Sequence, residues 1–275
     1  MTARLVFLHG SPGFNSYAEQ AILGPVFAAR GHEVAFWNEP SRLRPSGEAF
    51  EPSGACERWL TSAERFVLRS SETSAAHVIA HSFTVHAAMN IARRHPQRLA
   101  SLVLVAPGAD PVATFRNVMR VAREDLSETL PDVAETIDGC LGRTRAFFDE
   151  AMRDGLMNVL HDQKLFTHYW ADPAQMQASF AARARPEGEF DLESFFAVLG
   201  DFAERGDALF STAPVTVPTL VLFGAEDRIT PLHEQRVAIK AAIPHARIDV
   251  VTGCSHYVHL DRPEYFADIV VDWAS

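Results

Sequence analysis

One stretch of the sequence, His77 to His86, places a serine between a short apolar run and a helical pattern. The run covers residues 75–80, and apolar residues after the serine recur at helical spacing, at Val85, Ala88, Met89 and Ala92. A tight turn between a buried strand and a helix exposes the side chain at its apex. It also points the unpaired N–H groups of the first helical turn at whatever binds there. Ser82 is therefore a candidate nucleophile.

The residues around Ser82 match the G-x-S-x-G pattern of a nucleophile elbow in part. Ala80 is small, as the strained turn requires, but Thr84 is β-branched where glycine is usual. We expect Ser82 to have a positive φ despite Thr84. A serine that caps an ordinary helix is the alternative interpretation.

A second motif follows the first strand-like run, Arg4 to Leu8. The segment His9-Gly10-Ser11-Pro12-Gly13 is a loop shaped by glycine and proline. It resembles the oxyanion loop of α/β-hydrolases, which implies that the backbone N–H of Ser11 faces a substrate carbonyl. A plain turn between a strand and a helix is the alternative.

Composition excludes several classes of protein. Hydrophobic residues make up 47% and charged residues 22% of the 275, which is typical of a globular chain. The formal net charge is −10 and Lys and Arg cluster in nothing longer than a pair, so we expect no nucleic-acid or membrane partner. Three distant cysteines, with no signal-like or membrane-spanning run, indicate a cytoplasmic protein without disulfides or a zinc site.

Strand-like and helix-like segments alternate up to about residue 110 and again from Pro218. Between them, residues 111–212 show helical periodicity and hold many aromatic residues. The sequence therefore predicts a core made of residues 1–110 and 213–275, with an inserted helical cap at 111–212. The aromatic residues suggest an apolar roof over a substrate, although most of them could simply pack the interior of the cap.

Three polar residues follow buried strands in the order Ser82, Asp227, His256. Polar groups at the carboxyl ends of parallel strands share one edge of the sheet, where ligands bind. With G-A-E-D-R-I-T-P at 224–231 and G-C-S-H-Y-V-H-L at 253–260, the chain resembles the α/β-hydrolase superfamily over nearly its whole length.

The resemblance implies a role for each residue. Ser82 would be the nucleophile, His256 the base and Asp227 the residue that orients it. The N–H groups of Ser11 and Phe83 would form the oxyanion hole. Neither a metal nor an organic cofactor is implied, and serine at the elbow argues against the related enzymes that use aspartate there.

Other residues compete for these roles. His259 is the alternative base, and three histidines near the motifs are weaker candidates, at His9, His81 and His86. For the acid, Asp110 and Glu226 are the alternatives to Asp227.

The expected fold is an α/β-hydrolase fold with six parallel strands in the order 2-1-3-4-5-6 and helices on both faces. About four residues precede the first strand, so we expect the family's first two strands to be missing.

The expected function is that of a serine hydrolase, of the esterase or thioesterase type, that forms an acyl-enzyme on Ser82. Its partner would be a small, hydrophobic ester, thioester or related acyl compound. A carbon–carbon bond hydrolase or lyase with the same triad is an alternative, and an inactive ligand-binding member is another. The sequence leaves the oligomeric state open.

Overall fold

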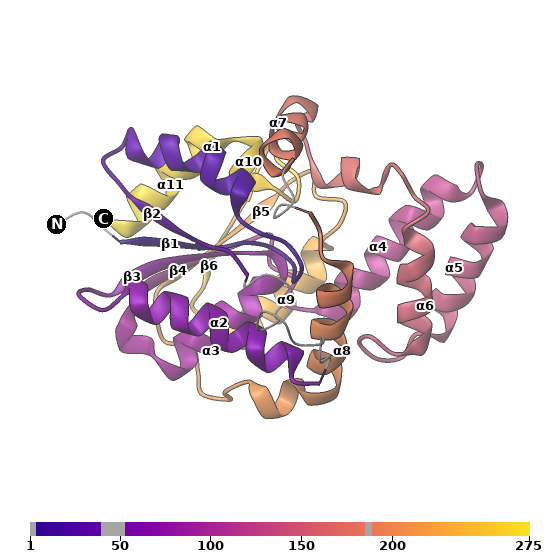
Figure 1. Ribbon diagram of the computed structural model, residues 1–275, viewed down its shortest axis with the longest axis horizontal. Coiled ribbons are helices and arrows are strands. Elements are labelled where there is room, and N and C mark those ends of the chain that lie inside the picture. Colours follow the sequence, from indigo (N-terminus) through magenta and orange to yellow (C-terminus); the bar gives the residue numbers. More distant parts are fainter. Residues whose placement is uncertain (1–3, 40–52, 185–188) are drawn as a thin grey trace, which may run out of the picture.

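The computed structural model of the protein describes residues 4–39, 53–184 and 189–275, which form one parallel sheet with helices on both faces (Figure 1). The described part of the chain has six strands in the order β2-β1-β3-β4-β5-β6, every neighbouring pair parallel. The predicted α/β-hydrolase fold and strand order are confirmed. The strands are β1 (Leu5–Leu8), β2 (Val34–Trp37), β3 (Ala76–His81), β4 (Leu99–Val105), β5 (Thr219–Gly224) and β6 (Arg247–Val251).

The inner strands β1 and β5 are buried on both faces because a helical layer covers each face, whereas the edge strands β2 and β6 are partly exposed. Leu5 and Phe7 of β1 face one layer, and Val6 and Leu8 face the other. The first layer consists of α1 (Tyr17–Ala28), the short α10 (Val258–Asp261) and α11 (Pro263–Ala274). The second consists of α2 (Ala55–Ser70), α3 (Val85–Arg94) and α9 (Leu232–Ala242).

Between β4 and β5, the described residues include the short 3₁₀ helix η4 (Leu165–Tyr169) and five α-helices. The α-helices are α4 (Pro111–Leu126), α5 (Pro131–Arg143), α6 (Glu150–Val159), α7 (Pro173–Arg183) and α8 (Leu192–Leu209). In Figure 1, α4, α5 and α6 project to the right of the sheet. By contrast, α7 packs against α1 and α8 against α2, so the inserted segment returns to the core at two places.

Aspartate side chains cap the N-termini of most of the inserted helices. Asp110, Asp149, Asp172 and Asp191 each accept a hydrogen bond from a backbone N–H in the first turn of α4, α6, α7 and α8. Proline at the first position of α4, α5 and α7 supports the same starts, because its fixed φ suits a helix and it has no N–H to leave unpaired.

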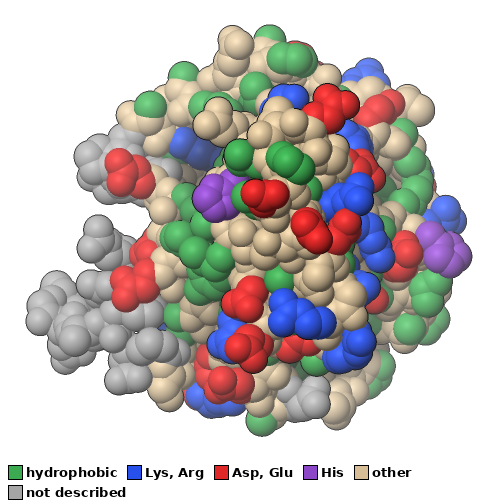
Figure 2. All heavy atoms as spheres, turned by 90° about the vertical axis from the view of Figure 1, so that its right-hand side faces the viewer, with side chains coloured by type: hydrophobic (Ala, Val, Ile, Leu, Met, Phe, Trp, Pro, Cys, Tyr) green, Lys and Arg blue, Asp and Glu red, His purple; other side chains and the backbone are tan. Residues whose placement is uncertain are grey.

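The outward face of the projecting helices carries acidic and basic side chains side by side rather than sorted by sign (Figure 2). Throughout the described ranges, no helix combines the length and the apolar composition that crossing a membrane would need.

The ends of β5 and β6 meet at Gly224, the last residue of β5. A Cβ on Gly224 would lie 2.1 Å from the carbonyl oxygen of Ser255 and 2.4 Å from that of Cys254. Only glycine allows this approach, which brings the loop after β5 against the turn that leads into His256.

We expect Gly224→Ala to destabilise the fold by about 1–3 kcal/mol, because the added methyl group meets backbone atoms that must shift. Gly142→Ala in α5 is the matched control, since no atom lies within 4 Å of the Cβ it would add. That change should leave stability equal or raise it by up to about 1 kcal/mol. Urea unfolding measures both, and equal effects would contradict the close packing inferred at Gly224.

Candidate active site

The chain turns sharply at Ser82, directly after β3. Residues Ser82–Thr84 form a single 3₁₀ turn that leads into α3. The φ of Ser82 is +55°, a left-handed conformation that a residue with a side chain rarely adopts. The expected positive φ is confirmed, and the interpretation of Ser82 as an ordinary helix cap is wrong, because its side chain caps neither helix.

Thr84 fits this turn through its hydroxyl group. The side chain is buried, and its Oγ1 donates to the carbonyl oxygen of His81 at 2.7 Å, with that of Leu8 3.4 Å away. The threonine therefore links the end of β3 to the end of β1, where the usual glycine could form no side-chain contact.

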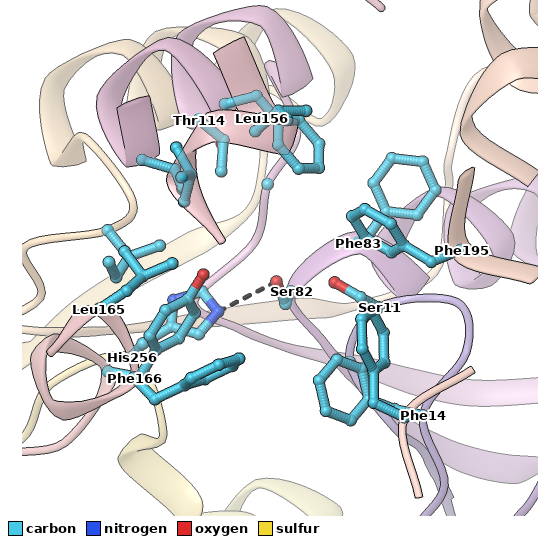
Figure 3. Close-up of a pocket in the computed structure, with 18 of the residues that line it drawn as sticks. Ser11, Phe14, Ser82, Phe83, Thr114, Leu156, Leu165, Phe166, Phe195 and His256 are labelled. Carbon is cyan, nitrogen blue, oxygen red and sulfur yellow. Dashed lines mark hydrogen bonds between the residues drawn. The ribbon is translucent and has the colours of Figure 1, made fainter. Parts of the chain in front are cut away.

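The structure brings Ser82, His256 and Asp227 together. Ser82 Oγ lies 3.0 Å from Nε2 of His256 (Figure 3), and Nδ1 of His256 lies 3.0 Å from Oδ2 of Asp227. Asp227 follows β5, and its other oxygen accepts from the N–H groups of Ile229 and Thr230. A carboxylate can only accept, so Nδ1 carries the proton and Nε2 is free to accept from the serine. The catalytic roles of these residues remain predictions.

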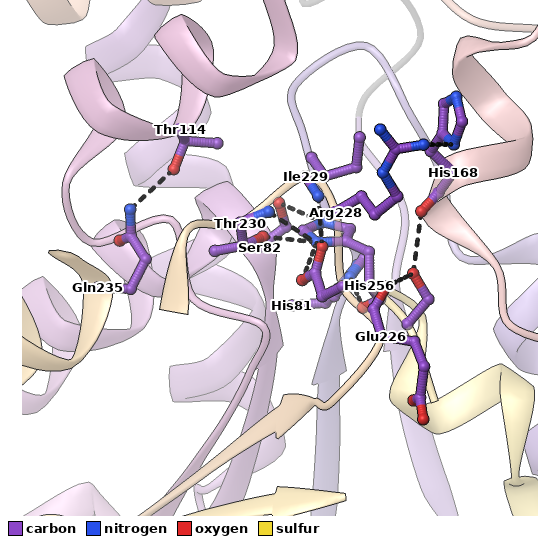
Figure 4. A network of polar contacts seen from close by, with 12 residues as sticks. His81, Ser82, Thr114, His168, Glu226, Arg228, Ile229, Thr230, Gln235 and His256 are labelled. Carbon is purple, nitrogen blue, oxygen red and sulfur yellow. Dashed lines mark hydrogen bonds and ion pairs between the residues drawn. The ribbon is translucent and has the colours of Figure 1, made fainter. Parts of the chain in front are cut away.

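Thr230 is a contact that the sequence analysis missed. Its Oγ1 lies 2.7 Å from Nδ1 of His256, closer than the carboxylate of Asp227, and the side chain is buried (Figure 4). The Nδ1–H group of His256 is thus shared between Asp227 and Thr230. A signal was present, because a hydroxyl three residues after Asp227 lies in the same tight turn.

The rings of two histidines that were alternative candidates for the base contact other parts of the structure. His9 stacks on Trp37, with ring centroids 4.6 Å apart, and burial lowers its pKa to about 3. His86 contacts the carbonyl oxygen of Gly108, and burial lowers its pKa to about 4.

His81 and His259 lie behind His256. The ring of His81 is tilted against that of His256, with centroids 4.8 Å apart, and the ring of His259 meets that of His81 edge-on. Nε2 of His81 contacts the carbonyl oxygen of His256, and burial holds the pKa of His81 well below the ordinary value. His259, the alternative base, is fully buried with its Nε2 3.6 Å from Oε1 of Glu19, and burial lowers its pKa. The structure therefore places His256 at the serine and His259 in the layer beneath.

Both alternative acids have structural uses. Asp110 caps α4 by accepting from the N–H of Ala113 at 2.9 Å. Glu226 accepts from the N–H groups of Gly253 and Cys254 at 3.0 and 2.8 Å, so it holds the turn that precedes His256.

The two predicted oxyanion donors lie on the other side of Ser82 from His256. Figure 3 shows Ser11 and Phe83 across the serine from the histidine. Ser11 belongs to the loop after β1, and Phe83 is the second residue of the turn. Both line the same cavity as Ser82 and His256. This arrangement suits an oxygen atom held between the two backbone segments.

The cavity over Ser82 is lined mainly by aromatic and aliphatic side chains. The sheet edge contributes Ser82, His256 and their neighbours, and the inserted helices contribute the remaining walls. The aromatic residues that line it are Phe14, Phe83, Phe115, Phe166, Tyr169, Phe190, Phe195, Phe196 and Tyr257. Several aromatic residues of the inserted segment therefore face the cavity rather than only one another.

The sequence analysis also missed a buried acid behind the loop that carries Ser11. The carboxyl of Glu39, which follows β2, accepts from the N–H of Gly13 at 3.0 Å and from the indole N–H of Trp59 at 2.7 Å. Burial raises the pKa of Glu39 to about 8, although these two N–H groups lower it. The sequence analysis did not single out Glu39, since burial cannot be read from a single charged residue.

Within the described ranges, no three His, Cys, Asp or Glu side chains are grouped so as to hold a metal ion. The three cysteines, Cys56, Cys140 and Cys254, are buried and free.

Comparison with known proteins gives a consistent picture. The model of the "Alpha/beta hydrolase family" matches residues 5–269. A 2-hydroxy-6-oxononadienedioate/2-hydroxy-6-oxononatrienedioate hydrolase of Cupriavidus pinatubonensis is 25% identical, covering 98% of this chain and 86% of its own. A 2-hydroxymuconate semialdehyde hydrolase of a Pseudomonas species is 26% identical over the same shares. The solved 2-hydroxy-6-oxo-6-phenylhexa-2,4-dienoate hydrolase of a Rhodococcus species superimposes with a TM-score of 0.61 at 14% identity, covering 98% of this chain and 90% of that one.

Thr230→Val should lower kcat/KM by about tenfold, because Nδ1–H of His256 loses one of its two acceptors while the side-chain volume is kept. Thr230→Ser, which keeps the hydroxyl, is the control and should stay near the wild type. Asp227→Asn should cost far more, about 10⁴-fold, because an amide can hold the histidine in the wrong tautomer. Steady-state kinetics on any substrate that the protein turns over measures kcat/KM for each variant. A larger loss of kcat/KM in Thr230→Val than in Asp227→Asn would contradict this prediction.

Glu39 predicts a pH dependence of stability. Because its pKa is raised in the folded protein, the folded state binds more protons than the unfolded state between about pH 4.5 and 8. The free energy of unfolding should therefore fall in the wild type, relative to Glu39→Gln, as pH rises through this window. Urea unfolding at several pH values measures the difference. Glu57→Gln, at an exposed position, is the control for loss of a surface charge. A difference between wild type and Glu39→Gln that stays constant from pH 5 to 8 would show that Glu39 ionises as in the unfolded chain.

Proposed function

The chain belongs to the alpha/beta hydrolase family, and on that premise we propose that it hydrolyses a hydrophobic carbonyl compound with Ser82 as its nucleophile. The observation that carries the proposal is the continuous contact from Ser82 Oγ to Nε2 of His256 and from its Nδ1 to Asp227. The strained turn at Ser82 supports it, because such strain persists where function requires it.

In the first step Ser82 Oγ attacks the carbonyl carbon, and its proton moves to Nε2 of His256. The imidazolium that forms is stabilised by Asp227 and by the hydroxyl of Thr230, both at Nδ1. His256 is almost fully buried, so these charges attract each other with little screening by water.

The negative charge that develops on the carbonyl oxygen is stabilised by the backbone N–H groups of Ser11 and Phe83. The bond to the leaving group then breaks, its electron pair leaves with that group, and His256 returns the proton to it from Nε2. Water attacks the acyl group on Ser82 in the second half of the reaction, again with His256 as base. The products are a carboxylic acid and the protonated leaving group.

We propose that the bond broken is a carbon–carbon bond next to a ketone. The expected ester or thioester substrate was the first interpretation of the sequence, but the curated relatives favour the alternative. These relatives match 98% of the chain and are named as hydrolases of 2-hydroxy-6-oxo-dienoates or of 2-hydroxymuconate semialdehyde. In the keto tautomer of such a substrate, which forms when the proton of the 2-hydroxyl group moves to the carbon beside the 6-ketone, the electron pair of the broken bond passes into the conjugated enone before that carbon is protonated.

We further propose that residues 111–212 act as the cap that shapes the substrate cavity. Three side chains from different parts of this segment line the cavity around Ser82 (Figure 3): Leu156 of α6, Phe166 of the 3₁₀ helix η4 (Leu165–Tyr169) and Phe195 of α8. Walls of this kind suit a planar, hydrophobic substrate, since aromatic side chains pack against flat conjugated groups.

With 2-hydroxy-6-oxo-6-phenylhexa-2,4-dienoate, the substrate in the name of one relative, we expect turnover by the wild type and a loss of at least about 10³-fold in Ser82→Ala. Product analysis should show benzoate, which requires cleavage of the carbon–carbon bond beside the ketone. A panel of p-nitrophenyl esters and acyl thioesters, run in parallel, tests the competing bond types.

Higher kcat/KM on esters or thioesters than on the dienoate would contradict the assignment of the carbon–carbon bond while leaving the nucleophile in place. A fluorophosphonate probe tests the nucleophile itself. Labelling of the wild type and loss of labelling in Ser82→Ala are expected, whereas an unlabelled wild type would favour a ligand-binding protein.

A further inference from the structure

The loop that carries Ser11 is held by three consecutive residues at the end of β2. Ser16 Oγ donates to the carbonyl oxygen of Trp37 at 2.6 Å, and the N–H of Ser16 donates to Oδ1 of Asn38 at 2.7 Å. The N–H of Gly13, two residues after Ser11, donates to Oε2 of Glu39 at 3.0 Å. The position of this loop therefore depends on the neighbouring strand.

The side chain of Glu39, which holds the loop through Gly13, also has a partner on another element. Its Oε1 accepts from the indole N–H of Trp59, a fully buried residue of α2. Both oxygens of the carboxyl are thus engaged by donors, one from the loop and one from the helical layer. An amide in the same place would turn an N–H group toward one of these donors.

Trp59 in turn packs against the turn at the nucleophile. Its ring lies 5.9 Å from the ring of Phe83 and 6.0 Å from that of Trp37. Phe83 is also the residue whose N–H is the second expected oxyanion donor. Glu39 therefore connects the loop of Ser11, through Gly13, to the turn of Phe83, through Trp59.

Two titratable groups face Glu39 from other elements. Nε2 of His9, after β1, lies 3.7 Å from Oε1, and Asp191, before α8, adds a repulsive charge that raises the pKa of Glu39. Burial lowers the pKa of His9 to about 3, so this ring is neutral near pH 7. Neither group offsets a negative charge on Glu39, so the two N–H donors are what hold the carboxyl in place.

We propose that Glu39 is a positioning residue that sets the distance between the two halves of the oxyanion hole. It is not among the residues that line the cavity, so it acts on the reaction only through Gly13 and Trp59. The proposal rests on the function proposed above in one respect, namely that the N–H groups of Ser11 and Phe83 bind the developing oxyanion.

The test compares Glu39→Gln with the wild type by two independent measurements. Kinetics should show kcat lowered roughly tenfold to a hundredfold with KM within about threefold, because only binding of the transition state is weakened. Amide hydrogen exchange should become faster in peptides that cover residues 10–14, while peptides from β4 stay unchanged. Glu57→Gln, a surface change on α2, is the matched control and should alter neither quantity.

Trp59→Phe provides a second variant if Glu39→Gln does not fold. It removes one donor to Glu39 and keeps the bond to Gly13, so the fall in kcat and the rise in exchange at residues 10–14 should both be present but smaller. An unchanged kcat, or a rise in KM that accounts for the whole loss of kcat/KM, would overturn the proposal. So would unchanged exchange at residues 10–14 in a folded variant.

The two measurements separate this proposal from the proposed function. If the wild type cleaves no carbonyl substrate but Glu39→Gln loosens residues 10–14, the function fails and the positioning of the loop by Glu39 stands. If the wild type is active and Glu39→Gln keeps both its kcat and its exchange pattern, the function stands and the role of Glu39 fails.

Discussion

The left-handed backbone at Ser82 is the constraint on which the rest of the site depends. At φ +55° the chain leaves β3 and enters α3 within three residues, so the serine hydroxyl stands above the sheet edge instead of packing in a layer. This conformation costs free energy, and the surrounding structure must supply it. Thr84 contributes by binding the carbonyl oxygen of His81, which fixes the turn from its far side.

Two other loops reach Ser82 because neighbouring strands end at the same edge of a parallel sheet. Asp227 follows β5, and His256 follows β6, the strand beside it. Gly224 allows these loops to touch, and Glu226 holds the backbone just before His256. The ring of His256 is thus oriented by several short contacts from adjacent loops. The inserted segment adds to them, because the ring of Tyr169 packs edge-on against His256 and the hydroxyl of Ser255 donates to the carbonyl oxygen of His168.

The inserted segment also forms the walls of the cavity. It provides most of the aromatic walls, and two of its helices, α7 and α8, pack on the core helices α1 and α2. The segment before α8 also reaches the loop of Ser11, where the N–H of Asp191 donates to the carbonyl oxygen of Gly13. Gly13 is therefore bound on its N–H side by the core and on its carbonyl side by the inserted segment. Movement of these helices would therefore shift the loop of Ser11.

The sequence by itself determined the strand order and the chain order of Ser82, Asp227 and His256. Alternating apolar runs and helical patterns are local signals, and right-handed crossovers leave few ways to arrange them. The sequence favoured His256 over His259, but only the tertiary structure showed which ring meets the serine, because both histidines follow the same strand and lie three residues apart. The tertiary structure also revealed Thr230 and Glu39, because burial and the pairing of Glu39 with Trp59 depend on how distant segments pack.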